Sequence, residues 1–138
     1  MDRLQKDLTL PRRPMGYLSA PISAPDALTR TRHHLIALGE SAQLWEAGVL
    51  HYCPHRNSPQ VGTTDQGYEA WMAMDIEVLR RCDYILMTGL WHESQGCRRE
   101  LALAMHLNLP VVYTVEAAIA LDEELRERLN TRPLEAVI

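Results

Sequence analysis

The segment Tyr84-Ile85-Leu86-Met87-Thr88 decides the fold, because it is a short apolar run that stops at Gly89. Such a run predicts a strand that is buried on both faces of a sheet. A helical pattern precedes it at about Glu69–Arg81, and a second helical pattern follows from Cys97 to about Leu107. A strand between two helices is the repeating unit of α/β proteins with a parallel sheet.

The same alternation continues on both sides of this segment. Further strands are expected at Met15–Ala20, Val49–Cys53 and Pro110–Val115, with helices from Pro25 to near Gly48, where Gly39 is a candidate break point, and at about Leu121–Leu129. Pro54 to about Tyr68 is rich in Pro, Gly, Asn, Ser and Thr, and this predicts a long loop of the kind that often forms a lid. We therefore predict one doubly wound α/β domain at 15–138, Rossmann-like or flavodoxin-like, with a parallel sheet of about four or five strands. Residues 1–14 are expected to form a flexible arm.

Composition and charge exclude several classes of protein. The net charge of −4 over 138 residues argues against a surface that binds duplex nucleic acid. Three cysteines without CxxC spacing suit a reducing compartment better than a disulfide framework. The sequence has neither a run of about 18 apolar residues nor, in residues 1–14, the apolar stretch of a secretory signal. We expect a cytoplasmic protein without a membrane partner.

Ligands of doubly wound domains bind beyond the carboxyl ends of the strands. Three segments are expected to meet there, namely Ser19–Asp26, Pro54–Tyr68 and Gly89–Glu100. Glu100 lies one turn into its predicted helix, on the side that bears Gly96, Cys97 and Ala104. Asp75 lies beside the apolar stripe of the preceding helix, so its carboxylate is expected at the boundary of the core. These two carboxylates are the first candidates for chemistry at this edge.

Three blocks of sequence resemble the nucleoside 2-deoxyribosyltransferase-like superfamily, which includes the deoxynucleoside 5′-monophosphate N-glycosidases. Tyr17-Leu18-Ser19-Ala20-Pro21-Ile22 is similar to that family's first strand and turn. Asp75 to Asp83 resembles the end of the helix that precedes the central strand. Ser94-x-Gly96-x-x-x-Glu100, followed by Ala102 and Ala104 and then by Leu109-Pro110-Val111, resembles the nucleophile helix and the next strand. The resemblance covers about Gly16 to Val115.

The resemblance implies a role for each matching residue. Glu100 matches the nucleophile that attacks the anomeric carbon, and Asp75 matches the carboxylate that helps to protonate the departing base. Tyr17 matches a tyrosine close to the nucleophile. Ser94 matches a position that is Asp in the transferases and Ser in the nucleotide hydrolases, where it helps to hold the 5′-phosphate. Gly96 adds backbone N–H groups at a helix N-terminus, a plausible site for an anion.

The sequence departs from the family at the first turn. The glycine of that turn is Ala20, and the Gly-rich run of the hydrolases is replaced by Pro21-Ile22-Ser23-Ala24-Pro25. Ser19 and Ser23 are candidates to replace the missing backbone donors through their hydroxyl groups. His55 is a further candidate substrate contact. Trp91 either stacks on a base or covers the end of the sheet, and both interpretations stay open.

The activity that the resemblance implies is cleavage of the N-glycosidic bond of a nucleoside or nucleoside 5′-monophosphate, by hydrolysis or by base exchange. Two alternatives stay open: a nucleotide-binding or regulatory module without turnover, and an N-glycosidase that acts on another ribosyl donor such as NAD. We expect no cofactor. His51, Cys53 and His55 lack a fourth ligand, so ordinary packing is favoured over a metal site. The family's sites are usually completed across an interface, which implies a homo-oligomer.

Overall fold

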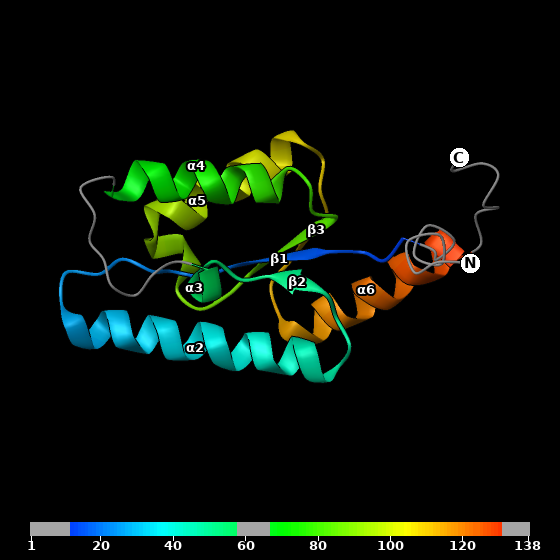
Figure 1. The fold of residues 1–138 in the computed structure, drawn as a ribbon, viewed down its shortest axis with the longest axis horizontal. Coiled ribbons are helices and arrows are strands. Elements are labelled where there is room, and N and C mark those ends of the chain that lie inside the picture. The colour runs from blue at the N-terminus through cyan, green and yellow to red at the C-terminus, as the bar shows by residue number, and fades with distance from the viewer. Residues whose placement is uncertain (1–11, 58–66, 131–138) are drawn as a thin grey trace, which may run out of the picture.

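The computed structural model describes residues 12–57 and 67–130 as an α/β domain (Figure 1). Its four strands are β1 (Gly16–Ser19), β2 (His51–Tyr52), β3 (Tyr84–Met87) and β4 (Val111–Val112). They form one sheet in the order β2-β1-β3-β4, and every described pairing is parallel. The helices are α2 (Ala27–Glu46), α3 (Pro54–Asn57), α4 (Gly67–Leu79), α5 (Gln95–His106) and α6 (Val115–Asn130), with a short 3₁₀ turn, η1, at Trp91–Glu93. The predicted fold class is therefore confirmed.

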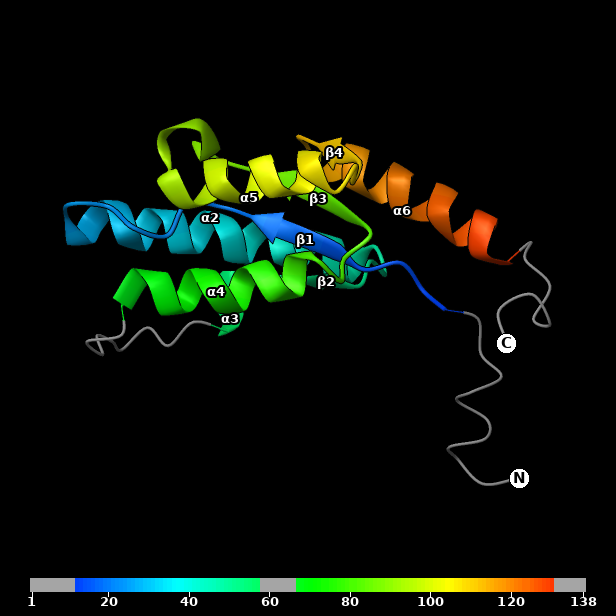
Figure 2. The same ribbon diagram turned by 90° about the horizontal axis from the view of Figure 1, so that it is seen from above.

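The helices cover both faces of the sheet. Figures 1 and 2 show α4 and α5 on one face and α2 and α6 on the other. Alternate residues of β1 and β3 enter two separate core clusters: Leu18 and Leu86 pack on the side of α2 and α6, whereas Tyr17 and Ile85 pack on the side of α4 and α5. Each central strand is buried on both faces, as the continuous apolar run of β3 predicts.

The strand order places a topological switch at β1. The chain passes from β1 to β2 on one side and then to β3 on the other side. Connections that leave neighbouring strands in opposite directions open a crevice beyond their carboxyl ends, and ligands bind there in this class of fold. Ser19 ends β1 and Met87 ends β3, and the two residues are register partners at this edge of the sheet.

Two expectations in the first half of the chain need correction. Gly39 does not break α2, which runs unbroken for 20 residues from an Asp26 N-cap that accepts a hydrogen bond from Thr29 N at 2.8 Å. A single interior glycine costs about 1 kcal/mol, which a helix of this length tolerates. The expected loop at 54–68 begins with helix α3, and α4 already starts at Gly67. Residues 58–66 of that loop lie outside the described residues.

The end of the domain also differs from expectation. The strand expected at Pro110–Val115 is reduced to Val111–Val112, and the last helix begins at Val115 instead of Leu121. Thr114 explains the early start, because its Oγ1 accepts a hydrogen bond from Ala117 N at 3.0 Å and so caps the helix. Threonine favours β-strands, so the sequence pattern predicted a strand that runs past this capping residue.

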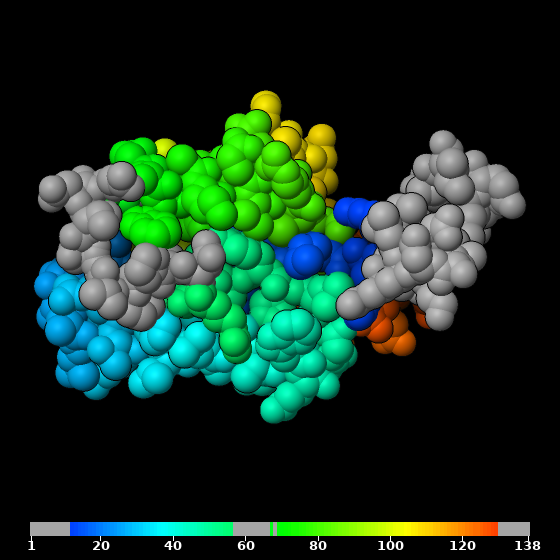
Figure 3. Space-filling view, in the orientation of Figure 1, coloured from blue at the N-terminus to red at the C-terminus, as the bar shows by residue number. Residues whose placement is uncertain are grey.

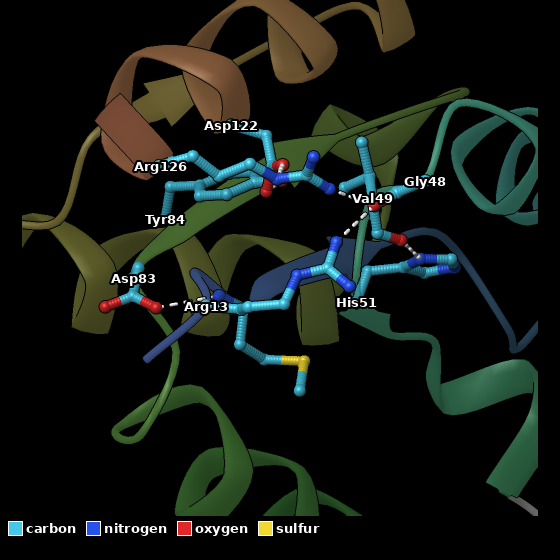
Figure 4. Close-up of polar contacts among 9 residues, drawn as sticks. Arg13, Gly48, Val49, His51, Asp83, Tyr84, Asp122 and Arg126 are labelled. Atoms are coloured by element: carbon cyan, nitrogen blue, oxygen red, sulfur yellow. Dashed lines mark hydrogen bonds and ion pairs between the residues drawn. The ribbon is translucent and has the colours of Figure 1, made fainter. Parts of the chain in front are cut away.

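A polar network closes the opposite edge of the sheet, at the amino ends of the strands (Figure 4). Asp83 accepts a hydrogen bond from Met15 N at 2.7 Å, so its carboxylate holds the chain at the start of β1. Arg13 and Arg126 both donate to the Gly48 carbonyl, and the buried Asp122 pairs with Arg126 at 3.1 Å. Residues 1–11 of the predicted arm lie outside the described residues, and the flexibility of 1–14 stays a prediction.

Candidate active site

Helix α5 carries Glu100 to the carboxyl edge of the sheet. The helix begins after Ser94, whose Oγ accepts a hydrogen bond from Cys97 N at 3.2 Å and caps it. Its buried residues are Cys97, Glu100 and Ala104, which confirms that Glu100 lies on the face with small residues. Only 5% of Glu100 is exposed. A carboxylate buried to this degree requires polar partners.

Strand β1 supplies those partners. The Tyr17 hydroxyl donates to Oε2 of Glu100, and the Ser19 hydroxyl donates to Oε1 at 2.8 Å. Tyr17 and Ser19 are two residues apart in a strand, so both side chains point to the same face. Each carboxylate oxygen therefore has one hydroxyl donor, and the orientation of the Glu100 side chain is fixed from the sheet.

Asp75 is the second buried carboxylate of this region, with 4% exposed. It projects from α4, and the Tyr52 hydroxyl of β2 donates to its Oδ1 at 3.1 Å. The ring centroids of Tyr17 and Tyr52 lie 5.6 Å apart, and the two residues are register partners on β1 and β2. The tyrosine pair therefore connects the surroundings of Asp75 to those of Glu100.

Burial is the main influence on both carboxyl groups. It raises the pKa of Glu100 to about 7; the hydrogen bonds from Tyr17 and Ser19 oppose this rise, whereas the negative charge of Asp75 adds to it. Burial also raises the pKa of Asp75 to about 6, against the hydrogen bond from Tyr52. The pKa of Tyr17 is raised by burial and by the charge of Glu100, so Tyr17 stays a proton donor at neutral pH. Two carboxyl groups that change protonation near neutrality are typical of acid–base and nucleophilic sites.

The predicted substrate contacts around α5 lie at the same edge. Ser94 is half-buried and uses its hydroxyl as the helix cap, and Gly96 is half-buried in the first turn of α5. Trp91 is half-buried in η1, packs against the core cluster beneath α5 and contacts the ring of Tyr113 at 5.9 Å. Ser23 is exposed in the segment between β1 and α2. These positions border the site without contacting Glu100 in any described hydrogen bond.

His55 binds the turn that follows β1. Its Nε2 lies 2.8 Å from the Pro21 carbonyl, and its Nδ1 lies 3.1 Å from Nδ1 of His34. The carbonyl only accepts, so Nε2 of His55 carries the proton and Nδ1 accepts from His34. Gly89 also approaches this turn, because a Cβ there would lie 3.7 Å from Cδ of Pro21. The described parts of the three segments expected at this edge therefore meet.

The histidine and cysteine residues of β2 are engaged with protein atoms. His51 contacts Ser41 Oγ at 2.6 Å through Nε2 and the Val49 carbonyl at 3.0 Å through Nδ1. Within residues 12–57 and 67–130, no three His, Cys, Asp or Glu side chains are grouped so that they could hold a metal ion. In the same two ranges, no helix has the length and apolar character needed to cross a membrane.

Tyr52 is the residue of this site that the sequence did not reveal. Its role depends on the register of β1 and β2, which pairs Tyr17 with Tyr52 and so puts both rings on one face. The strands that the sequence predicts, Met15–Ala20 and Val49–Cys53, carry no signal of this pairing, because Tyr17 is the third residue of one and Tyr52 is the fourth residue of the other. Without knowledge of the register, nothing distinguishes Tyr52 from any other aromatic residue in an apolar strand.

The fold and this site define a doubly wound α/β domain with two buried carboxylates at its switch point. Over residues 17–113 the chain matches the family described as "Domain of unknown function (DUF4406)", and it belongs to that family. A solved structure described as a 2-deoxyribosyltransferase from the psychrotolerant bacterium Bacillus psychrosaccharolyticus is similar at 20% identity and a TM-score of 0.48, over 70% of this chain and 69% of that chain. No curated protein sequence matches this chain.

Proposed function

We propose that this protein cleaves the N-glycosidic bond of a nucleoside or nucleoside 5′-monophosphate, with Glu100 as the nucleophile. The observation that carries the proposal is the fixed, buried carboxylate of Glu100, which accepts from Tyr17 and Ser19 beside a second buried carboxyl group, that of Asp75. The resemblance of the Ser94–Glu100 and Asp75–Asp83 blocks to the nucleoside 2-deoxyribosyltransferase-like superfamily supports the same assignment of roles.

In the first step an oxygen of Glu100 bonds to C1′ of the sugar while the bond from C1′ to the base nitrogen breaks. The electron pair of that bond goes to the base, which takes a proton from Asp75. Tyr17 and Ser19 hold the attacking carboxylate in one orientation, so little reorganisation is needed on the way to the transition state. The product of this step is a glycosyl ester on Glu100.

In the second step a new nucleophile attacks C1′ and releases the Glu100 carboxylate. Attack by water, whose proton passes to Asp75, gives the free sugar and makes the protein a hydrolase. Attack by the nitrogen of an acceptor base, whose N–H proton likewise passes to Asp75, gives a new nucleoside and makes the protein a transferase. Both outcomes use the same first intermediate, so the two activities differ only in the acceptor.

A 5′-monophosphate has a natural place at the N-terminus of α5. The backbone N–H groups near Gly96 and the helix dipole favour an anion there. The Ser94 hydroxyl accepts from Cys97 N in the described structure, and rotation of the hydroxyl would turn its own proton from the neighbouring Cys97 thiol to a phosphate oxygen. Ser94→Asp retains a capping oxygen and adds a negative charge, so it is expected to lower the rate on monophosphates more than the rate on nucleosides.

The test is release of free base from a panel of ribo- and deoxyribonucleosides, their 5′-monophosphates and NAD, with and without an acceptor base. Release without an acceptor identifies a hydrolase, and exchange that requires an acceptor identifies a transferase. Glu100→Gln is expected to lower the rate at least about 1,000-fold, whereas the matched exposed variant Glu93→Gln leaves it unchanged. Wild-type rates in Glu100→Gln contradict the mechanism. Tight binding of one panel member without turnover supports a binding module instead.

The location in the cytoplasm and the homo-oligomeric state stay predictions.

A further inference from the structure

The turn between β1 and α2 is held by its carbonyl groups. Pro21 and Pro25 have no N–H group, so two of the amides that could fix this segment are missing. Nε2 of His55 donates to the Pro21 carbonyl at 2.8 Å, and Nη1 of Arg30 donates to the Ala24 carbonyl at 2.8 Å. Both donors come from helices that pack against the turn, so its position depends on side chains outside it.

A second histidine fixes the ring of His55. His55 lies on α3, which packs beside α2 (Figures 1 and 3). Its Nδ1 lies 3.1 Å from Nδ1 of His34 on α2, and the two ring centroids are 5.3 Å apart. Because Nε2 of His55 carries the proton that the Pro21 carbonyl accepts, its Nδ1 is an acceptor, and the proton between the two rings belongs to His34. Each ring therefore sets the tautomer of the other.

This arrangement requires a neutral His55. Only 4% of the residue is exposed, and burial lowers its pKa; the hydrogen bond to Pro21 opposes this effect, whereas His34 and His33 add to it. A neutral imidazole offers one donor and one acceptor, and both are engaged here. His55 therefore acts on a substrate through the turn that it holds.

The turn borders the proposed reaction without carrying it. Ser19, whose hydroxyl donates to Glu100, ends β1 two residues before Pro21. The Ser19 carbonyl accepts from Thr88 N at 3.0 Å, so the sheet itself holds this residue. The Pro21 carbonyl lies beyond the strand, and its contact with a histidine fixes the peptide unit that leads toward Ser23, a candidate substrate contact. Loss of that contact would move the turn and leave the donor to Glu100 in place.

We propose that His34 and His55 are positioning residues, whose hydrogen-bonded pair holds the turn that forms one wall of the crevice beyond β1. Neither residue takes part in the making or breaking of a bond. The pair acts on substrate binding and not on the chemical step, because Ser19 keeps its contacts when the turn moves. The kinetic consequence rests on the proposed function, whereas the pairing of the two rings does not.

The first experiment identifies the protonated nitrogen of each ring and needs no substrate. Long-range ¹H–¹⁵N correlation spectra are recorded on ¹⁵N-labelled protein at about pH 8, above the ordinary pKa of histidine. The proton of His34 is expected on Nδ1 and that of His55 on Nε2. His34→Asn and His55→Gln each remove one set of signals and so assign them. A neutral His34 with its proton on Nε2, or exchange of either ring between both tautomers, overturns the pairing.

The second experiment compares kcat and KM for the panel member that is cleaved fastest. His55→Leu removes the donor to the Pro21 carbonyl and is expected to raise KM about five- to tenfold, while kcat stays within about twofold. His55→Gln places an amide N–H where Nε2 lies and is expected to recover most of this loss. His106→Leu, at an exposed position of α5, is the control for the loss of a histidine and is expected to leave KM unchanged.

The outcomes separate the positioning role from the proposed function. An unchanged KM in His55→Leu overturns the role, as does a fall in kcat at unchanged KM. If His55→Leu does not fold, His34→Leu at a half-buried position decides the question: it is expected to raise KM about threefold, and His34→Asn to restore it. Absence of cleavage across the whole panel contradicts the proposed function, and the tautomer experiment then decides the histidine pair by itself.

Discussion

Replacement of Glu100 by Gln is expected to change how the stability of the protein depends on pH. Burial raises the pKa of this carboxyl group from its ordinary value of 4.5 to about 7 in the folded state. The folded protein therefore binds a proton that the unfolded chain has already released between these values. The contribution of Glu100 to stability is fully present below about pH 4.5 and is lost as pH rises through about 7.

The size of this loss follows from the two pKa values. One pH unit corresponds to about 1.4 kcal/mol, so the full difference between 4.5 and about 7 is of the order of 3 kcal/mol. Roughly 2.5 kcal/mol of it falls between pH 5 and pH 8. Glutamine has the shape of the protonated acid and does not titrate. It keeps one oxygen that accepts from Tyr17 or Ser19, and its amide group donates to the other hydroxyl.

The assay is urea unfolding of wild type and Glu100→Gln at pH 5 and at pH 8, followed by circular dichroism. The free energy of unfolding of the variant relative to wild type is expected to rise by about 2.5 kcal/mol between the two pH values. Titrating groups that do not interact with Glu100 are common to both proteins and cancel in this difference, whereas the coupling to Asp75 is counted as part of the effect of the variant. The exposed variant Glu93→Gln is the control and is expected to follow wild type. A relative stability of Glu100→Gln that is the same at both pH values refutes the reasoning, because the buried carboxyl group would then titrate as an ordinary one.

Three further predictions follow from single contacts. Tyr52→Phe removes the hydrogen bond that lowers the pKa of Asp75. The break in the pH–rate profile that belongs to Asp75 is therefore expected to move upward from about 6 by less than about one unit, while the rate at pH 5 stays unchanged. An equal loss of rate at every pH contradicts this prediction. Gly16→Ala places a Cβ 2.6 Å from Cζ of the buried Tyr84, so urea unfolding is expected to show a loss of about 1–3 kcal/mol, and wild-type stability contradicts the packing. Ser94→Ala removes the cap of α5 and is expected to cost about 1 kcal/mol, whereas Ser94→Asp keeps most of it; equal stabilities of the two variants argue against the cap.

The central part of the fold was predictable because its signals are local. The apolar run of Tyr84–Met87 ends at a glycine, and helical patterns flank it on both sides. The placement of Glu100 was predictable for the same reason, since its face of α5 follows from helical periodicity alone. The roles proposed for it, as nucleophile and as partner of Asp75, rest on the resemblance to a family.

What failed depended on information that a single segment does not contain. Thr114 favours a strand by its side chain but caps α6 through its hydroxyl, so the predicted boundary was too late. Tyr52 joins the site only because β1 and β2 pair in one register. His55 meets the Pro21 carbonyl through the packing of α3 against the turn after β1, a contact between residues 34 positions apart. Register and packing of distant segments are set by the whole core.

The measurement that tests the central claim most directly is identification of the covalent intermediate. The protein is mixed with the panel member that it cleaves fastest, quenched in acid within one turnover, digested and analysed by peptide mass spectrometry. We predict one added glycosyl group on the peptide that contains Glu100, and none in Glu100→Gln. A cleaving enzyme whose glycosyl group lies on another residue, or whose adduct forms equally in Glu100→Gln, would contradict the assignment of Glu100 as the nucleophile.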